Sequence, residues 1–361
     1  MLKGGLGKIV VMNIFFIKDR SRGSGVRAGI MLAVACGCLA GDPRPVSAGC
    51  GDVSGENTGL GYLTAPSLSP GHILRPSSIF VLPTPGAKGA ERLDFDFHWG
   101  NVWNYTPDKF MIDGEWLRSS LRYSYALKET VSVGVAVPVV GRMGGFTDPA
   151  IETFHKSFGL GDGGQKDFPA NQSRIAFNTS GATNVVAEGD SWGLGDLSVF
   201  GTAQLTPGTH VWPAVTVQAE LFFPTGDQDQ LRGMGSPAIA LSSAASKRLG
   251  ASPFISFLGL GFQYCDSEDL SVIEFHNEQY SGLVGLEYQY SRTFCLLVQY
   301  LISSPVATDY YAFSESCHEV SAGIKWRVEN GSSFELAVVE NIAVFKNSAD
   351  IGLHLAYGRN L

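Results

Sequence analysis

The strongest constraint on the fold of this 361-residue sequence is an alternation of apolar and polar residues with a period of two. In the segment VSVGVAVPV, residues 131–139, valine occupies every second position, and Ser, Gly, Ala or Pro stands between. Because successive side chains of a β-strand point to opposite faces, this segment predicts a strand with one apolar face. The pattern returns in later segments whose second face carries polar residues, and these cover 280–290, 294–302, 318–327 and 351–361.

Helices are not expected to cross a membrane beyond residue 90, because no apolar stretch there approaches the ~18 residues that a spanning helix needs. Strands cross a bilayer only as a closed barrel, in which every backbone N–H and C=O is paired. We therefore predict an all-β fold, a transmembrane antiparallel β-barrel of about 12 strands over residues 91–361, with the even strand number of bacterial barrels. The predicted strands lie near 92–104, 111–125, 131–140, 191–206, 214–223, 237–249, 253–265, 279–290, 294–303, 316–327, 334–340 and 350–361.

The connections between these strands differ in length. The short ones are ALKET, TPGTHVWP, GAS, SRT and VENGSS, and the longest covers residues 141–190. Since outer-membrane barrels have short periplasmic turns and longer extracellular loops, the short connections predict the periplasmic end. Aromatic residues beside the short turns predict an interfacial girdle, namely Tyr123, Tyr125, Trp212, Tyr288, Tyr290, Phe294, Trp326 and Phe334. A soluble β-sandwich or barrel with aromatic core residues also alternates, and it is the alternative fold.

Residues 1–48 are predicted to be a signal peptide. They begin with basic residues, continue through the apolar run AGIMLAVACGCLAG and end with VSA, which is the order typical of secretory signals. A retained membrane anchor and lipid attachment at Cys50 are the alternatives. Residues 49–90 are rich in Gly, Pro and Ser, and we interpret this N-terminal segment as a periplasmic tail, a lumenal insert or a first β element. The net charge of −8 becomes more negative without the basic leader, so no nucleic-acid partner is expected.

The longest connection contains a helix signal, GGFTDPAIETFHKSFGLGDGG at residues 144–164. Asp148 is a suitable N-cap, Pro149 suits the first helical position and Gly159 suits the end. The apolar face would hold Ile151, Phe154 and Phe158, and the polar face Glu152, His155 and Lys156. A helix this short is marginal alone in water, so its aromatic face is expected to pack on the inner wall or rim of the barrel. We therefore predict an extracellular helix-bearing loop, which either narrows the lumen or is a structural cap.

The same stretch resembles a known family. GGFTDPAIETFHKSFGL is similar to the loop signature of the bacterial outer-membrane barrel family of domain of unknown function DUF3187, and LRPSSIFVLPTPGA, DGEWLRSSLRYSYAL and SWGLGDLSVFG are also similar to segments of that family. The resemblance spans most of residues 70–361. It implies a porin-like protein of the outer membrane and supplies no substrate.

Charged residues of the first predicted hairpin are candidates for a polar track in the lumen. The candidates on the first strand, Asp94, Asp96 and His98, share one face, as do Arg118 and Arg122 on the second. A turn centred near Pro107 would place Asp96 beside Arg118. One interpretation is ion pairing that neutralises lumenal charges. The other is a track that orients solutes at a constriction.

Three classes of function remain open. A channel for small solutes comes first, a structural or surface barrel second, and a barrel-embedded lipid enzyme third. The enzyme is not expected, because no nucleophile elbow, P-loop or dinucleotide fingerprint occurs, although His98, His155 or His354 could meet a serine across strands. The pair Glu152 and His155 has E-x-x-H spacing, but a metal site of that kind needs a second such motif, so no metal and no cofactor are predicted. The expected partners are outer-membrane lipid, small solutes and the barrel assembly machinery.

Overall fold

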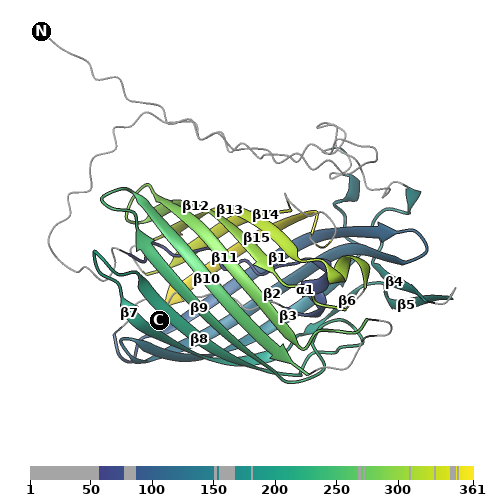
Figure 1. Ribbon diagram of the computed structural model, residues 1–361, viewed down its shortest axis with the longest axis horizontal. Coiled ribbons are helices and arrows are strands. Elements are labelled where there is room, and N and C mark those ends of the chain that lie inside the picture. The colour runs from purple at the N-terminus through teal and green to yellow at the C-terminus, as the bar shows by residue number, and fades with distance from the viewer. Residues whose placement is uncertain are drawn as a thin grey trace, which may run out of the picture.

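The structure is a computed structural model, and it describes residues 57–76, 87–149, 153, 167–179, 182–266, 270, 273–308, 310–328, 331–341, 347 and 349–361. Within them one antiparallel sheet has 15 strands, and all but the short β4, β5 and β6 form a closed ring (Figure 1). The ring strands are β1 (Glu91–Thr106), β2 (Phe110–Lys128), β3 (Val131–Met143), β7 (Leu197–Pro207), β8 (Ala214–Phe223), β9 (Ala238–Arg248), β10 (Phe254–Cys265), β11 (Glu278–Gln289), β12 (Phe294–Ser303), β13 (Cys317–Arg327), β14 (Ser333–Glu340) and β15 (Ile351–Asn360).

Neighbouring strands pair in chain order, and the ring closes between the first and the last. β3 pairs with β7, and β1 pairs with β15 from Arg92↔Asn360 to Asn101↔Ile351. The predicted 12-stranded antiparallel barrel is confirmed, and the strand ends differ from the predicted ones by only a few residues. The five connections predicted to be short all lie at one end of the barrel, because consecutive strands run in opposite directions.

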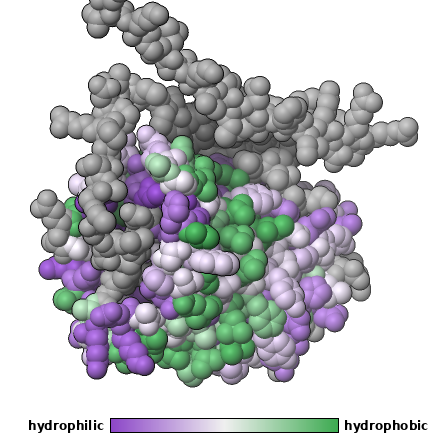
Figure 2. Space-filling view, turned by 60° about the vertical axis from the view of Figure 1, so that its left-hand side comes forward, coloured by the Kyte–Doolittle hydropathy of each residue, from purple (hydrophilic) through white to green (hydrophobic). Residues whose placement is uncertain are grey.

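The two faces of the wall differ as the alternation predicts. On β3 the valines at 133, 135, 137 and 139 are exposed on the outer surface. Figure 2 shows hydrophobic residues gathered in a broad band on the visible face, with hydrophilic residues on either side. The inner face is polar and buried, and includes Gln218, Glu220, Glu287, Gln299 and Lys325. Five aromatic residues of the predicted girdle are exposed, namely Tyr125, Trp212, Tyr290, Trp326 and Phe334.

The region from 174 to 196 departs from the prediction. β4 (Arg174–Thr179) and β5 (Ala182–Glu188) form a hairpin within the connection predicted to be a loop, and β4 extends the sheet from the start of β2. Its Phe177 is buried against Phe110 and Phe313 in an apolar cluster. In Figure 1 this hairpin projects beyond the barrel at the end opposite the short turns.

The predicted strand 191–206 is divided into β6 (Ser191–Leu194) and β7. Both parts pair with β3, but Gly195 and Asp196 lie between them outside the ladder. The Asp196 carboxylate accepts hydrogen bonds from the backbone N–H groups of Gly226 (2.9 Å) and Met234 (2.7 Å). The connection between β8 and β9 therefore docks where the strand is interrupted.

One helix is described before the barrel strands, the five-residue α1 (Pro70–Leu74). Ser69 caps it, because its hydroxyl accepts the backbone N–H of His72, and Pro70 occupies the first turn, where a missing N–H costs nothing. None of the described helices is long and apolar enough to cross a membrane.

Candidate functional site in the barrel lumen

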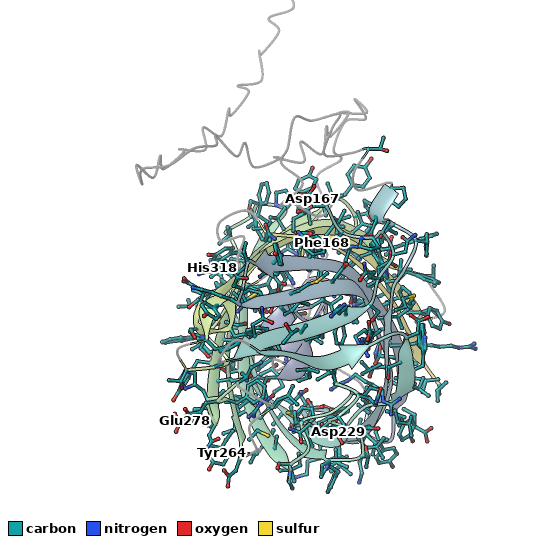
Figure 3. All side chains as sticks on the ribbon, turned by 90° about the vertical axis from the view of Figure 1, so that its right-hand side faces the viewer. Asp167, Phe168, Asp229, Tyr264, Glu278 and His318 are labelled. Atoms are coloured by element: carbon teal, nitrogen blue, oxygen red, sulfur yellow. The ribbon has the colours of Figure 1, made fainter. Side chains whose placement is uncertain are left out.

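The described part of the N-terminal segment, residues 57–76, lies inside the ring of strands. Figure 3, which looks along the barrel, shows α1 within the ring. The segment begins near the short-turn end, where Asn57 donates to the carbonyl of Thr209 (2.8 Å) and accepts from the N–H of Arg248 (3.1 Å). We call residues 57–76 the lumenal segment.

Polar side chains of the inner wall hold the backbone of the lumenal segment. Both carboxylate oxygens of Glu287 on β11 accept the N–H of Leu60, at 3.1 and 3.0 Å. Gln299 on β12 accepts the N–H of Leu63 (2.9 Å) and donates to its carbonyl (3.2 Å). Because these bonds use main-chain groups that would otherwise be buried without partners, they fix the position of the segment.

An apolar cluster adds to these hydrogen bonds. Tyr62 and Leu63 are buried against side chains from β10 to β12, including Phe257 and Leu297. The rings of Tyr62 and Phe257 meet edge to face, with centroids 5.7 Å apart. The lumenal segment therefore has a small hydrophobic core of its own beside the polar side chains that bond to its backbone.

Five titratable side chains form a continuous chain of contacts across the inner face of β13, β14, β15 and β1. Lys325 pairs with Glu335 (2.7 Å), and the other oxygen of Glu335 meets Nε2 of His354 (3.1 Å). Nδ1 of His354 lies 2.9 Å from Nδ1 of His98, whose Nε2 lies 3.0 Å from Asp96. One of the two facing Nδ1 atoms must donate to the other, so the pair is held as one unit.

The lumenal segment also bonds to this chain of contacts. Thr64 donates its backbone N–H to Glu335 (3.1 Å) and its hydroxyl to the same oxygen (3.3 Å). Lys325 donates to the carbonyl of Leu60 (3.4 Å). The five side chains of this chain of contacts are thus bonded partly to one another and partly to the lumenal segment.

At the far end of the lumenal segment, α1 is fixed by buried polar groups. Gly71 donates its N–H to Asn347 (3.2 Å), and Arg75 donates to the carbonyl of Cys265 (3.4 Å) and stacks over Phe275. Nδ1 of His72 lies 2.8 Å from the Ser69 hydroxyl. Burial lowers the pKa of His72 to about 4, so the imidazole is neutral near pH 7.

The predicted pairing of Asp96 with Arg118 is wrong by two residues. Asp96 lies opposite Ser120, and Arg118 lies opposite His98. The turn between β1 and β2 centres on Asp108, which adopts a left-handed conformation (φ 58°), and not on Pro107. Moving the centre of a hairpin by one residue moves every cross-strand partner by two.

The other predicted lumenal charges have local partners. Asp94 pairs with Arg92 on its own strand (2.6 Å). Arg122 lies 3.7 Å from Glu220 on β8 and stacks over Phe200 at 4.1 Å. The Glu220 carboxylate also accepts hydrogen bonds from Ser198 (2.5 Å) and Gln218 (3.0 Å).

The predicted loop helix lies largely outside the residues that the structure describes. Its predicted polar residues Glu152, His155 and Lys156 are all outside the described residues. Asp148 is described and buried, and its carboxylate accepts from Asn101 (3.2 Å) and from the N–H of Asn171 (2.7 Å). It therefore ties both ends of the long connection to the wall.

Glu115 on β2 is a residue that sequence reasoning missed. It is fully buried, and one oxygen accepts the N–H groups of Phe146 and Thr147, both at 2.8 Å. Trp99 donates to the other oxygen (2.8 Å). The long connection is thereby anchored where it leaves β3. A lone glutamate in a predicted strand gave no signal of this role.

A hollow lies between the lumenal segment and the inner wall beside the interruption of β6 and β7. It contains about 580 Å³ of space between its lining atoms, some of it open to solvent. Within the described residues, no group of three or more His, Cys, Asp or Glu side chains is arranged to hold a metal ion.

Comparison with known proteins supports the barrel assignment. The model of one protein family, described as a protein of unknown function, matches residues 50–360. The chain belongs to the DUF3187 family. No curated protein matches it.

Several solved structures are similar to this chain. The COG4313 outer membrane channel from Pseudomonas putida F1 is 13% identical over 78% of this chain and 97% of that one, with a TM-score of 0.52. The Pseudomonas putida toluene transporter TodX is 11% identical over 76% and 90%, with a TM-score of 0.35. A Pseudomonas aeruginosa FadL homologue is 11% identical over 75% and 89%, with a TM-score of 0.33. The first similarity shows that this DUF3187 protein has the fold of an outer-membrane channel, and at that identity it shows the fold alone.

Proposed function

We propose that this DUF3187 protein is an outer-membrane channel for small solutes. The observation that carries the proposal is a closed ring of strands with exposed apolar side chains outside and buried polar side chains inside. Such a wall suits lipid on one side and a polar passage on the other. The similarity of fold to an outer-membrane channel supports it.

We assign the parts of the chain accordingly. Residues 1–48 are the signal peptide, 49–90 are the N-terminal segment, of which residues 57–76 lie in the lumen, and 91–361 are the barrel, inserted by the assembly machinery into outer-membrane lipid. The short turns face the periplasm. Outer-membrane fractionation together with heat-modifiable gel migration tests this assignment, and recovery of the processed protein in the soluble fraction would contradict it.

Two features narrow the passage. The first is the lumenal segment, with its bonds to Glu287, Gln299 and Glu335. The second is the extracellular loop 141–190, whose helix would present Glu152, His155 and Lys156 to the solute, with Asp148 holding the base of the loop. The inner-wall residues Asp94, Asp96, His98, Arg118 and Arg122 supply the polar track.

Conductance tests the proposal. Purified full-length processed protein in a planar bilayer is expected to conduct, and deletion of residues 146–160 is expected to increase the conductance of each open channel. Deletion variants that fold, as judged by heat-modifiable migration, and yet conduct like the intact protein would refute the role of the loop.

A structural barrel that transports nothing is the second candidate. The observation that favours it is the number of buried bonds that fix the lumenal segment, because a permanently held segment would block the passage. A bilayer that stays silent with the intact protein and with every lumenal variant would support this candidate and contradict the channel.

A further inference from the structure

The hollow beside the lumenal segment has mainly apolar walls. Its lining comes from the lumenal segment, from β2, β3 and β8, and from the connection between β8 and β9. The apolar side chains that matter most are Leu68, Ile73, Trp116, Pro138, Phe222 and Leu231. Trp116 and Leu231 are almost fully buried. A solute in this space would meet both aromatic and aliphatic side chains.

Three charged side chains also line the hollow, and two of them are already engaged. Asp196 accepts the backbone N–H groups described above, and Arg232 pairs with Asp227 (3.0 Å) and donates to the carbonyl of Trp192 (2.5 Å). These two residues build the wall and do not need a ligand.

Arg118 is different. It forms no ion pair and no hydrogen bond with any described residue, and its Nε, like that of Arg232, is buried without a partner. His98, its neighbour across the strand pair, is engaged with Asp96 and His354. Arg122, four residues along the same strand, has Glu220 as its partner. The carboxylates of Asp96, Asp196 and Glu220 act on its charge without forming an ion pair with it, so the guanidinium can still take an anion in direct contact.

We propose that this hollow binds a small carboxylate with one apolar body, such as an aromatic or short alkyl monocarboxylate. The planar guanidinium of Arg118 would hold the carboxylate through two parallel N–H···O bonds, and the ring or chain would lie against Trp116, Phe222 and Leu231. This inference rests on the proposed function and names its substrate class. A site of mainly apolar walls with one arginine that has no ion pair selects an amphipathic monoanion over a neutral solute of the same shape.

The test uses benzoate and its neutral isostere benzamide as probes. Full-length processed protein in detergent is equilibrated with radiolabelled benzoate, and benzamide competes for the site. We expect benzoate to bind at least about tenfold more tightly than benzamide, which is the ratio that one charge-assisted bidentate contact supports. Equal affinity of the two probes, or no benzoate binding, overturns the proposal without the need for any variant.

Variants locate the site. Arg118→Gln is expected to weaken benzoate binding about tenfold or more and to leave benzamide binding unchanged, whereas Arg118→Lys should restore part of the loss. The matched control is Arg248→Gln, which removes an arginine that already donates to Gln289 and to the carbonyl of Ser252 and lies outside the polar track, so it should change benzoate affinity little. Heat-modifiable migration verifies that each variant folds. Equal losses in the two glutamine variants would show a general effect of lumenal charge and would refute the assigned site.

The result is separable from the channel proposal, because binding is measured in detergent. Protein that binds benzoate selectively but never conducts keeps the site and contradicts the channel. Protein that conducts but does not distinguish benzoate from benzamide keeps the channel and refutes the site.

Discussion

Leu63→Ala is expected to release the lumenal segment while leaving the barrel closed. Leu63 is 2% exposed and packs in the cluster formed with β10 to β12. Truncating a leucine in such a site costs about 2–5 kcal/mol, since apolar contact is lost and a cavity remains. At about 1.4 kcal/mol for each factor of ten, a loss of ~3 kcal/mol weakens docking of the segment by roughly a hundredfold. The bonds of Leu63 to Gln299 use only backbone groups, so the substitution leaves them in place.

Hydrogen exchange measured by mass spectrometry reports this docking directly. The amides of residues 60–64 should exchange roughly a hundredfold faster in the variant if they exchange by undocking, while those of β11 and β12 should be unchanged. Leu258→Ala is the matched control, because Leu258 is 49% exposed on the outer face of β10, and its loss should alter neither region. Unchanged exchange at 60–64 in a folded Leu63→Ala protein would show that the cluster does not hold the segment. Equal changes in β11 would show that the segment and the barrel are one cooperative unit.

Three further outcomes are expected. Glu115→Ala should remove the acceptor of the loop N–H groups and weaken the anchoring of residues 144–148 by at least about 2 kcal/mol. Protease cleavage within residues 144–148 should therefore be faster in this variant. The control is Glu188→Ala, because Glu188 is exposed. Undocking of the lumenal segment returns the pKa of His72 from about 4 toward 6.5, so docking is strongest above pH 6.5 and loses up to about 3 kcal/mol as the pH falls to 4. Hydrogen exchange of the amides of residues 69–76, corrected for intrinsic rates, should show this loss. The substitution His72→Gln should abolish the pH dependence. Trp326→Ser should lower the urea stability of the barrel in vesicles by about 1–2 kcal/mol, because an exposed aromatic side chain leaves the girdle.

The barrel wall was predictable because each strand separates two environments. An apolar exterior and a polar interior impose a period of two on every strand, and the strand ends follow from where that period stops. The register of the first hairpin was not predictable to the same accuracy, because it depends on which residue occupies the left-handed position of the turn. Both Pro107 and Asp108 suit a turn, and only the structure distinguishes them.

The position of the lumenal segment had no local signal. Leu60 and Glu287 are separated by 227 positions in the chain, and the bonds that Glu287 and Gln299 make are to backbone groups. Every residue except proline has the same backbone N–H group, so the sequence of the lumenal segment does not predict that Glu287 and Gln299 bond to it. Ser69 and Pro70 define the start of α1, and neither residue indicates that the helix lies in the lumen.

The interruption between β6 and β7 did leave a signal in the sequence. Before it, the exposed side chains Trp192 and Leu194 occupy even positions, whereas Val199 after it is exposed at an odd one. A continuous strand keeps one parity on each face, so this change requires an extra residue out of register between the two parts. Gly195 and Asp196 provide it, and the same two residues line the hollow beside Arg118. The wall therefore departs from a regular barrel at the position where the alternation of exposed side chains changes. The proposed binding site lies at this same position. This agreement is expected if a local irregularity is retained for function.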